Sequence, residues 1–318
     1  MESSYDVVVV GGGAAGLSGA LALARARRSV LVVDSGAPRN APAGGVHNYL
    51  GREGTPPGEL VAAGRAEVAS YGGEVVTGSV TVARPEGGGF RVELDDGTSV
   101  GARRLLVTTG LVDELSDVPG LALRWGRDVL HCPYCHGWEV REQPIGVLST
   151  GPMAAHQALL FRQWSSDVTL FLHTGPELTD EQSEQLAARD IAVVDGEVTG
   201  LQVTDDRLTG LQLAGGQVIG CRAVVVAPRV AARAEVLTGL GLGTTDLEID
   251  GYVFGSHVAA DAKGATSIPG VWVAGNVTDP LAQVISSAAA GLNAAAAING
   301  DLVAEDTADA VTARRHGL

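Results

Sequence analysis

The chain has few cysteines, few aromatic residues and a single lysine. Three cysteines in 318 residues are too few for a disulfide scaffold, so a catalytic use of cysteine is the better expectation. Because Lys263 is the only lysine, a Schiff-base mechanism has almost no candidate residue. No run of about 20 apolar residues occurs, and the acidic residues 1–6 do not resemble a secretory signal. We therefore expect a cytoplasmic protein without a membrane span.

Positive charge is also scarce. The 22 lysines and arginines face 37 aspartates and glutamates, which gives a net charge of −15. This balance argues against binding to nucleic acid or to an anionic membrane surface. A hydrophobic content of 45% and 44 glycines are typical of a well-packed, turn-rich α/β protein, and the length suggests about two domains.

Two of the three cysteines form a Cys-x-x-Cys motif at Cys132 and Cys135. Pro133 suits the first position of a helix, where unpaired N–H groups stabilise a thiolate on the preceding cysteine. A structural zinc site would need a second ligand pair, and only Cys221 remains. A purely structural disulfide is the other alternative. We favour redox chemistry and predict no metal.

The N-terminal segment predicts a nucleotide site. A run of valines, residues 7–10, is typical of a strand buried on both faces. Gly11, Gly13 and Gly16 follow with G-x-G-x-x-G spacing, at the start of an alanine-rich helix that can receive a pyrophosphate. The next predicted strand ends at Asp34, which is placed to hold a ribose hydroxyl.

Further along the chain, residues 35–57 form a long irregular stretch, which is either a functional loop or a solvated surface loop. Residues 111–119 resemble a linker into a second domain. Residues 144–151 repeat the strand-and-turn pattern but have lost most of the glycines, so nucleotide binding there is doubtful. An alanine-rich helix is predicted over residues 282–298.

These pieces, taken in order, resemble the low-molecular-weight thioredoxin reductases, a family of FAD-dependent disulfide oxidoreductases. The resemblance rests on the first glycine motif, the cysteine pair, residues 108–110, Pro119-Gly120, and residues 274–276 with Gln283. It implies an α/β fold class with two Rossmann-like, FAD/NAD(P)-binding, three-layer ββα domains. A discontinuous FAD domain (1–114 and 246–318) would enclose a central NAD(P)-binding-like domain (115–245) that carries the cysteines. It also implies a homodimer.

The resemblance further implies which residues bind FAD. By analogy, the glycine motif and Asp34 would bind the ADP half, and later residues would lie along the ribityl chain and the isoalloxazine ring. The implied set is Gly11, Gly13, Ala14, Ala15, Gly16, Asp34, Ser35, Arg39, Asn40, His47, Asn48, Val80, Thr109, Gly110, Gly275, Asn276, Gln283 and Val284.

The chain also departs from the reductase pattern. The central nucleotide turn keeps one glycine, Gly151, and the stretch 172–175 lacks the arginines that would grip the 2′-phosphate of NADPH. We therefore expect poor NADPH binding. His136 replaces the acid that usually follows the second cysteine, and Asn276 replaces the usual aspartate of the C-terminal flavin motif.

The motif Cys-Pro-Tyr-Cys-His-Gly is similar to that of flavin-dependent dithiol oxidases, which close disulfides in small natural products such as gliotoxin and holomycin. This resemblance implies that a substrate thiolate attacks Cys132, while Cys135 faces the flavin and O2 is reduced to H2O2. His136 would be the base, paired with Asn40, because imidazole titrates near neutrality. The alternative role of His136 is a polar residue on a helix face.

Two other functions stay open. In the first, electrons run from NADPH or ferredoxin through FAD to thioredoxin. In the second, the protein is a non-catalytic redox sensor that controls a partner.

Overall fold

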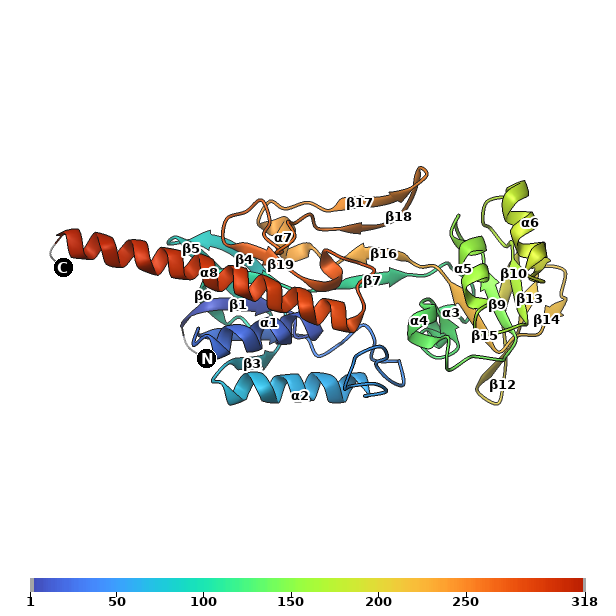
Figure 1. Cartoon of the computed structure of the whole chain (residues 1–318), viewed down its shortest axis with the longest axis horizontal. Helices are drawn as coiled ribbons and strands as arrows, with labels where there is room; N and C mark the ends of the chain where they lie inside the picture. The colour runs from blue at the N-terminus through green and yellow to red at the C-terminus, as the bar shows by residue number, and fades with distance from the viewer. Residues whose placement is uncertain (1–2, 317–318) are drawn as a thin grey trace.

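The computed structural model describes residues 3–316, and its first domain is built on a mainly parallel sheet (Figure 1). Within these residues the sheet has seven strands in the order β3-β2-β1-β6-β5-β4, with β19 beside β6. The strands next to β1 are parallel, and β4 and β5 form an antiparallel edge. Their bounds are β1 (Ser4–Val10), β2 (Val30–Asp34), β3 (Glu74–Thr77), β4 (Val80–Glu86), β5 (Gly89–Leu94), β6 (Ser99–Val107) and β19 (Val271–Val273).

Both faces of this sheet are covered, which explains its continuous apolar strands. Helices α1 (Ala14–Arg25), α2 (Pro57–Ser70) and α8 (Val284–His316) lie on one face, where Val7 and Val9 point. On the other face Val8 joins a core that includes Leu237 from α7 (Glu235–Gly239).

The central domain is the second Rossmann-like unit. Its parallel sheet has the order β11-β10-β9-β15-β8, and a smaller antiparallel sheet, β12-β13-β14, packs beside it. The element bounds are α3 (Leu121–Arg124), β8 (Val129–Leu130), β9 (Ile145–Leu148), α5 (Ala154–Phe161), β10 (Val168–Phe171), α6 (Asp180–Ala188), β11 (Ala192–Val194), β12 (Val198–Thr204), β13 (Arg207–Leu213), β14 (Val218–Ile219) and β15 (Ala223–Val226).

Two antiparallel strands, β7 (Leu111–Glu114) and β16 (Arg229–Ala232), connect the two bodies (Figure 1). They continue into a sheet with β18 (Tyr252–His257) and β17 (Thr245–Ile249). The predicted linker over residues 111–119 is therefore wrong at its start, where the chain forms a strand. The core also divides earlier than the predicted boundary at 245, because α7 packs into the first domain.

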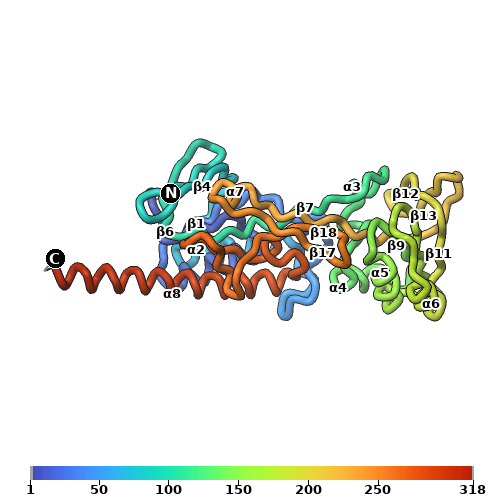
Figure 2. Tube along the Cα trace, turned by 90° about the horizontal axis from the view of Figure 1, so that it is seen from above, coloured from blue at the N-terminus to red at the C-terminus, as the bar shows by residue number. Residues whose placement is uncertain are grey.

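Helix α8 extends to His316, well beyond the predicted end at residue 298. Apolar spacing misses this extension because ion pairs hold it. Arg104 lies 2.5 Å from Asp301, and Arg103 lies 2.7 Å from Glu305. Past these contacts the helix projects beyond the body of the domain (Figure 2).

The crossing of α1 and α8 depends on Gly291. A Cβ atom at Gly291 would lie 1.9 Å from the carbonyl oxygen of Ala15, whereas one at Gly300, on the same helix, would meet nothing within 4 Å. We expect Gly291→Ala to lower the free energy of unfolding by about 1–3 kcal/mol through overpacking. Gly300→Ala should instead raise it by roughly 1 kcal/mol. Urea denaturation of the two variants tests this contrast, and equal stabilities would contradict it.

Candidate active site

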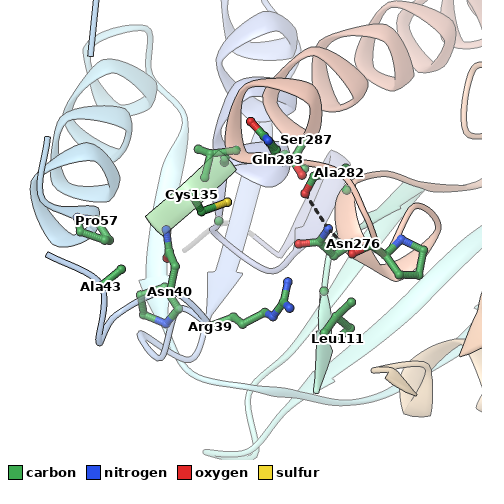
Figure 3. A pocket seen from close by; sticks show the side chains of 18 of the residues that line it. Arg39, Asn40, Ala43, Pro57, Leu111, Cys135, Asn276, Ala282, Gln283 and Ser287 are labelled. Carbon is green, nitrogen blue, oxygen red and sulfur yellow. Dashed lines mark hydrogen bonds between the residues drawn. The ribbon is translucent and has the colours of Figure 1, made fainter. Parts of the chain in front are cut away.

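A cavity of about 1250 Å³ runs from the glycine turn of the first domain to the cysteine pair of the central domain. Figure 3 shows its middle part, where Cys135 from the central domain faces Asn276 and Gln283 from the first domain. The volume exceeds the roughly 300–1,000 Å³ of an ordinary small-molecule pocket, so a cofactor and a substrate can share it.

The first glycine turn is shaped to receive phosphate. Gly11 has a φ of +104°, and a Cβ there would lie 2.6 Å from the carbonyl oxygen of Thr108. Gly16 packs so closely that its Cβ would lie 1.9 Å from the oxygen of Gly11. Gly13 faces open space. The turn therefore leaves the N-terminus of α1 free for a pyrophosphate.

The acid at the end of β2 is also in place. Asp34 accepts a hydrogen bond of 3.0 Å from the backbone N–H of Gly12 and forms an ion pair with Arg65. A Cβ at Gly12 would lie 2.8 Å from the Cβ of Asp34. The G-x-G-x-x-G spacing does not single out Gly12 as a site residue, although three consecutive glycines indicate a tightly packed turn there. Together the turn and the acid fit the ADP half of FAD.

Most of the predicted site residues line the cavity. Gly16 does not, because it is buried against the turn, and Asn48 does not, because its side chain is used elsewhere. Those that line it are Gly11, Gly13, Ala14, Ala15, Asp34, Ser35, Arg39, Asn40, His47, Val80, Thr109, Gly110, Cys132, Cys135, His136, Gly275, Asn276, Gln283 and Val284.

Asn276, in the short helix η1 (Gly275–Val277), lines the cavity opposite the cysteine pair. Its amide nitrogen lies 3.0 Å from the carbonyl oxygen of Asp279 and 2.9 Å from that of Ala282 (Figure 3). An aspartate could not donate these hydrogen bonds. The replacement of the usual acid is therefore explained by the loop that the amide holds.

The cysteine pair begins helix α4 (Pro133–His136), with Cys132 at the N-cap, as predicted. Cys135 donates a hydrogen bond to the sulfur of Cys132 at 2.8 Å. That bond, and backbone N–H groups of Cys135 and Tyr134, lower the pKa of Cys132 to about 7. The same bond and burial raise the pKa of Cys135. Cys132 is thus the more acidic thiol of the pair, and both cysteines line the cavity.

His136 is poised as a proton acceptor. Among residues 3–316, neither of its ring nitrogens has a hydrogen-bond partner, and both are buried. Burial lowers the pKa of His136, so its ring is neutral at physiological pH. The predicted pairing with Asn40 is not formed here. Asn40 lines the same cavity and points toward Cys135 (Figure 3).

The stretch 35–57 contacts the cysteine helix. Asn48, with φ of +59°, donates a 2.6 Å hydrogen bond to the carbonyl oxygen of Tyr134, between the two cysteines. His47 lies 2.6 Å from Glu53 and 3.5 Å from Glu139, just past the helix. The side chain of Asn48 therefore makes a contact between the domains.

Arg39 supplies positive charge beside the cysteines. Both of its hydrogen bonds to the carboxylate of Asp113, on β7, measure 2.6 Å. Figure 3 shows the side chain reaching across the cavity toward Leu111. Its charge further lowers the pKa of Cys132.

Residues 5–295 match the family model of the pyridine nucleotide-disulphide oxidoreductases. The chain belongs to this family. Thioredoxin reductase sirT of Leptosphaeria maculans is 29% identical over 330 residues, covering 96% of this chain and 97% of the relative. Thioredoxin reductase tcpT of Claviceps purpurea (strain 20.1) is 36% identical over 185 residues, but the match covers only 58% of that relative and 55% of this chain.

Solved structures agree. The crystal structure of HlmI superposes with a TM-score of 0.92 at 49% identity, covering 100% of this chain and 99% of that one. An oxidoreductase from Agrobacterium tumefaciens has a TM-score of 0.87 at 34% identity, covering 94% and 99%. The protein is thus an FAD-dependent oxidoreductase with the thioredoxin reductase-like fold, as its sequence predicts.

No group of three or more histidine, cysteine, aspartate or glutamate side chains in residues 3–316 is arranged to hold a metal ion. In the same range, no helix combines the length and apolar character needed to cross a membrane.

The geometry of the cysteine pair predicts unequal reactivity in the reduced enzyme. Because the pKa of Cys132 is about 7, its alkylation by iodoacetamide should reach half its maximal rate near pH 7. Cys135 should react more slowly throughout. Peptide mass spectrometry across pH 5–10 measures both rates. In Cys135→Ala the S–H donor is lost, so the midpoint for Cys132 should move to higher pH; an unchanged midpoint would refute the assigned cause.

Proposed function

We propose that the protein is an FAD-dependent dithiol oxidase that closes an intramolecular disulfide in a small natural-product dithiol, with O2 as the acceptor. The observation that carries this proposal is the imidazole of His136 next to the cysteine pair, whose two ring nitrogens are buried and have no hydrogen-bond partner within residues 3–316, in the cavity that fits FAD. A neutral imidazole can take a proton from a thiol, which oxidation of a dithiol requires.

In the proposed cycle, one substrate thiolate attacks Cys132 of the closed Cys132–Cys135 disulfide, and Cys135 leaves as a thiolate. The second substrate thiol then attacks the mixed disulfide, which releases the cyclic product and leaves both cysteines reduced. His136 accepts the substrate protons and returns them to the departing sulfurs. Bound FAD supplies the two-electron path by which O2 becomes H2O2, so two electrons and two protons pass from substrate to oxygen.

One observation disfavours the reductase alternative driven by NADPH. In the central domain, a Cβ at Gly175 would lie 1.9 Å from the hydroxyl oxygen of Ser149, so this segment packs against the nucleotide turn. Residues 172–175 contain no arginine that could form charge-assisted hydrogen bonds with a 2′-phosphate. We place the protein in the cytoplasm, where thiols are kept reduced. The three cysteines are free in the structure, as expected for that compartment.

The proposal is tested in an oxygen electrode with reduced cyclic dithiols. Wild-type holoenzyme should consume one O2 per disulfide formed and release H2O2. His136→Ala should lower kcat by roughly 10²- to 10⁴-fold, because the general base is gone. His316→Ala, at the exposed end of α8, is the control and should not differ from wild type. Rapid anaerobic bleaching of the flavin by NADPH would instead support the reductase.

We further propose a homodimer that uses an exposed face of α8. Ile285, Leu292 and Val303 are exposed, and at 100° per residue they lie within about 20° of one another on the helix. Val311, also exposed, flanks this apolar stripe. A second copy of the chain can cover it.

Replacing Val303 with glutamate places a charge in this stripe and should convert the dimer to a monomer. Thr307 lies near the same face, whereas Asp309 lies on the opposite side, so Asp309→Lys is the matched control. Analytical ultracentrifugation gives the masses. A wild-type monomer, or a Val303→Glu dimer of unchanged affinity, would refute the interface.

A further inference from the structure

The two Rossmann-like units have equivalent turns after their first strands, but only one of these turns is open to a ligand. Gly13 is the third residue after β1, and Gly151 is the third residue after β9. A Cβ at Gly13 would meet nothing within 4 Å, which leaves that turn open to a ligand. A Cβ at Gly151 would lie 2.8 Å from the ring and the hydroxyl oxygen of Tyr252. Protein therefore covers the second turn.

The covering residue comes from the other body. Tyr252 is the first residue of β18, whose sheet continues through β16 and β7 outside the central domain. Its hydroxyl donates a 3.2 Å hydrogen bond to the carbonyl oxygen of Thr150, in the turn itself. A dinucleotide would place its phosphates against this turn, at the N-terminus of α5.

We infer that Tyr252 occupies the degenerate nucleotide turn of the central domain in place of a dinucleotide, and thereby holds the cysteine pair at the FAD cavity. The inference rests on the proposed function, in which the central domain has no nucleotide to bind. Tyr252 is a positioning residue, because it touches the turn and not the reacting sulfurs.

The Tyr252 contact is one of two regions in which the first domain touches the central domain. In the other region, Asn48 binds the carbonyl oxygen of Tyr134, and Pro42 lies where a Cβ at Gly126 would be only 2.9 Å away. The covalent connection consists of β7 and β16 alone. The first domain thus contacts the central domain through Asn48 and through Tyr252. Without one of these contacts, the central domain can rotate about the connecting strands β7 and β16.

The test uses holoenzyme reduced anaerobically by dithiothreitol, with two optical readouts: the rate of flavin bleaching and the long-wavelength charge-transfer absorbance of a thiolate beside flavin. We expect Tyr252→Ala to slow bleaching by on the order of tenfold or more and to weaken the charge-transfer band. Tyr252→Phe keeps the ring and should stay close to wild type. Tyr71→Ala removes another exposed tyrosine of the first domain and is the control.

An unchanged band and rate in Tyr252→Ala, with full FAD content, would overturn the inference. Because dithiothreitol replaces both the natural dithiol and oxygen turnover, this result is separate from a failure of the proposed oxidase function. A wild type that bleaches normally but consumes no O2 with cyclic dithiols would refute the function and leave the role of Tyr252 standing.

A tether provides an independent measurement if Tyr252→Ala loses FAD or folds poorly. Cysteines at Thr150 and Tyr252 can be joined with a short bis-maleimide in the oxidised enzyme. There, Cys132 and Cys135 are closed, and burial raises the pKa of Cys221 to about 12, so the new pair reacts selectively. The untethered double variant should oxidise dithiothreitol slowly, like Tyr252→Ala, and the tether should restore at least half of the wild-type rate. An untethered variant as fast as wild type, or a tethered enzyme no faster than the untethered one, would overturn the inference.

Discussion

The contact between helix α4 and the cavity of the first domain is the constraint on which the rest of the structure depends. Sulfur can exchange electrons with a flavin only at close range, yet the cysteines and the glycine turn belong to different bodies. Two strands connect those bodies. The position of Cys135 is therefore decided by non-covalent contacts, chiefly Asn48 on one side of the central domain and Tyr252 on the other.

The departures from the reductase pattern have structural counterparts. Where an aspartate is usual, Asn276 donates to carbonyl groups of the following loop, which a carboxylate could not do. Where a nucleotide turn is usual, Gly151 receives the ring of Tyr252. Of these two features, only the contact at Gly151 concerns the central domain, and it fits the proposal that this domain binds no dinucleotide.

Features that depend on local sequence were predictable. The glycine turn, the end of β2 and the N-cap position of Cys132 follow from short-range rules about strands, helix starts and φ angles. Contacts between distant segments were not. Asn48 and Tyr134 are 86 residues apart, and Thr150 and Tyr252 are 102 apart. No periodicity records such a contact, so Asn48 was assigned to the flavin and Tyr252 to nothing. The extension of α8 is likewise not predictable from local sequence, because ion pairs with arginines on the distant strand β6 stabilise it.

Burial determines the chemical effect of having His136 where the reductase pattern has an acid. A low-dielectric environment favours the neutral form of any titratable group. For a carboxylic acid the neutral form carries a proton, so a buried acid at this position is a donor, as reduction of a disulfide requires. For imidazole the neutral form lacks the proton, and burial lowers the pKa of His136 in that direction. The same pocket therefore makes a proton donor of one residue and a proton acceptor of the other. Reversal of the chemistry from reduction to oxidation thus needs no new cavity, only a side chain whose uncharged form is the base.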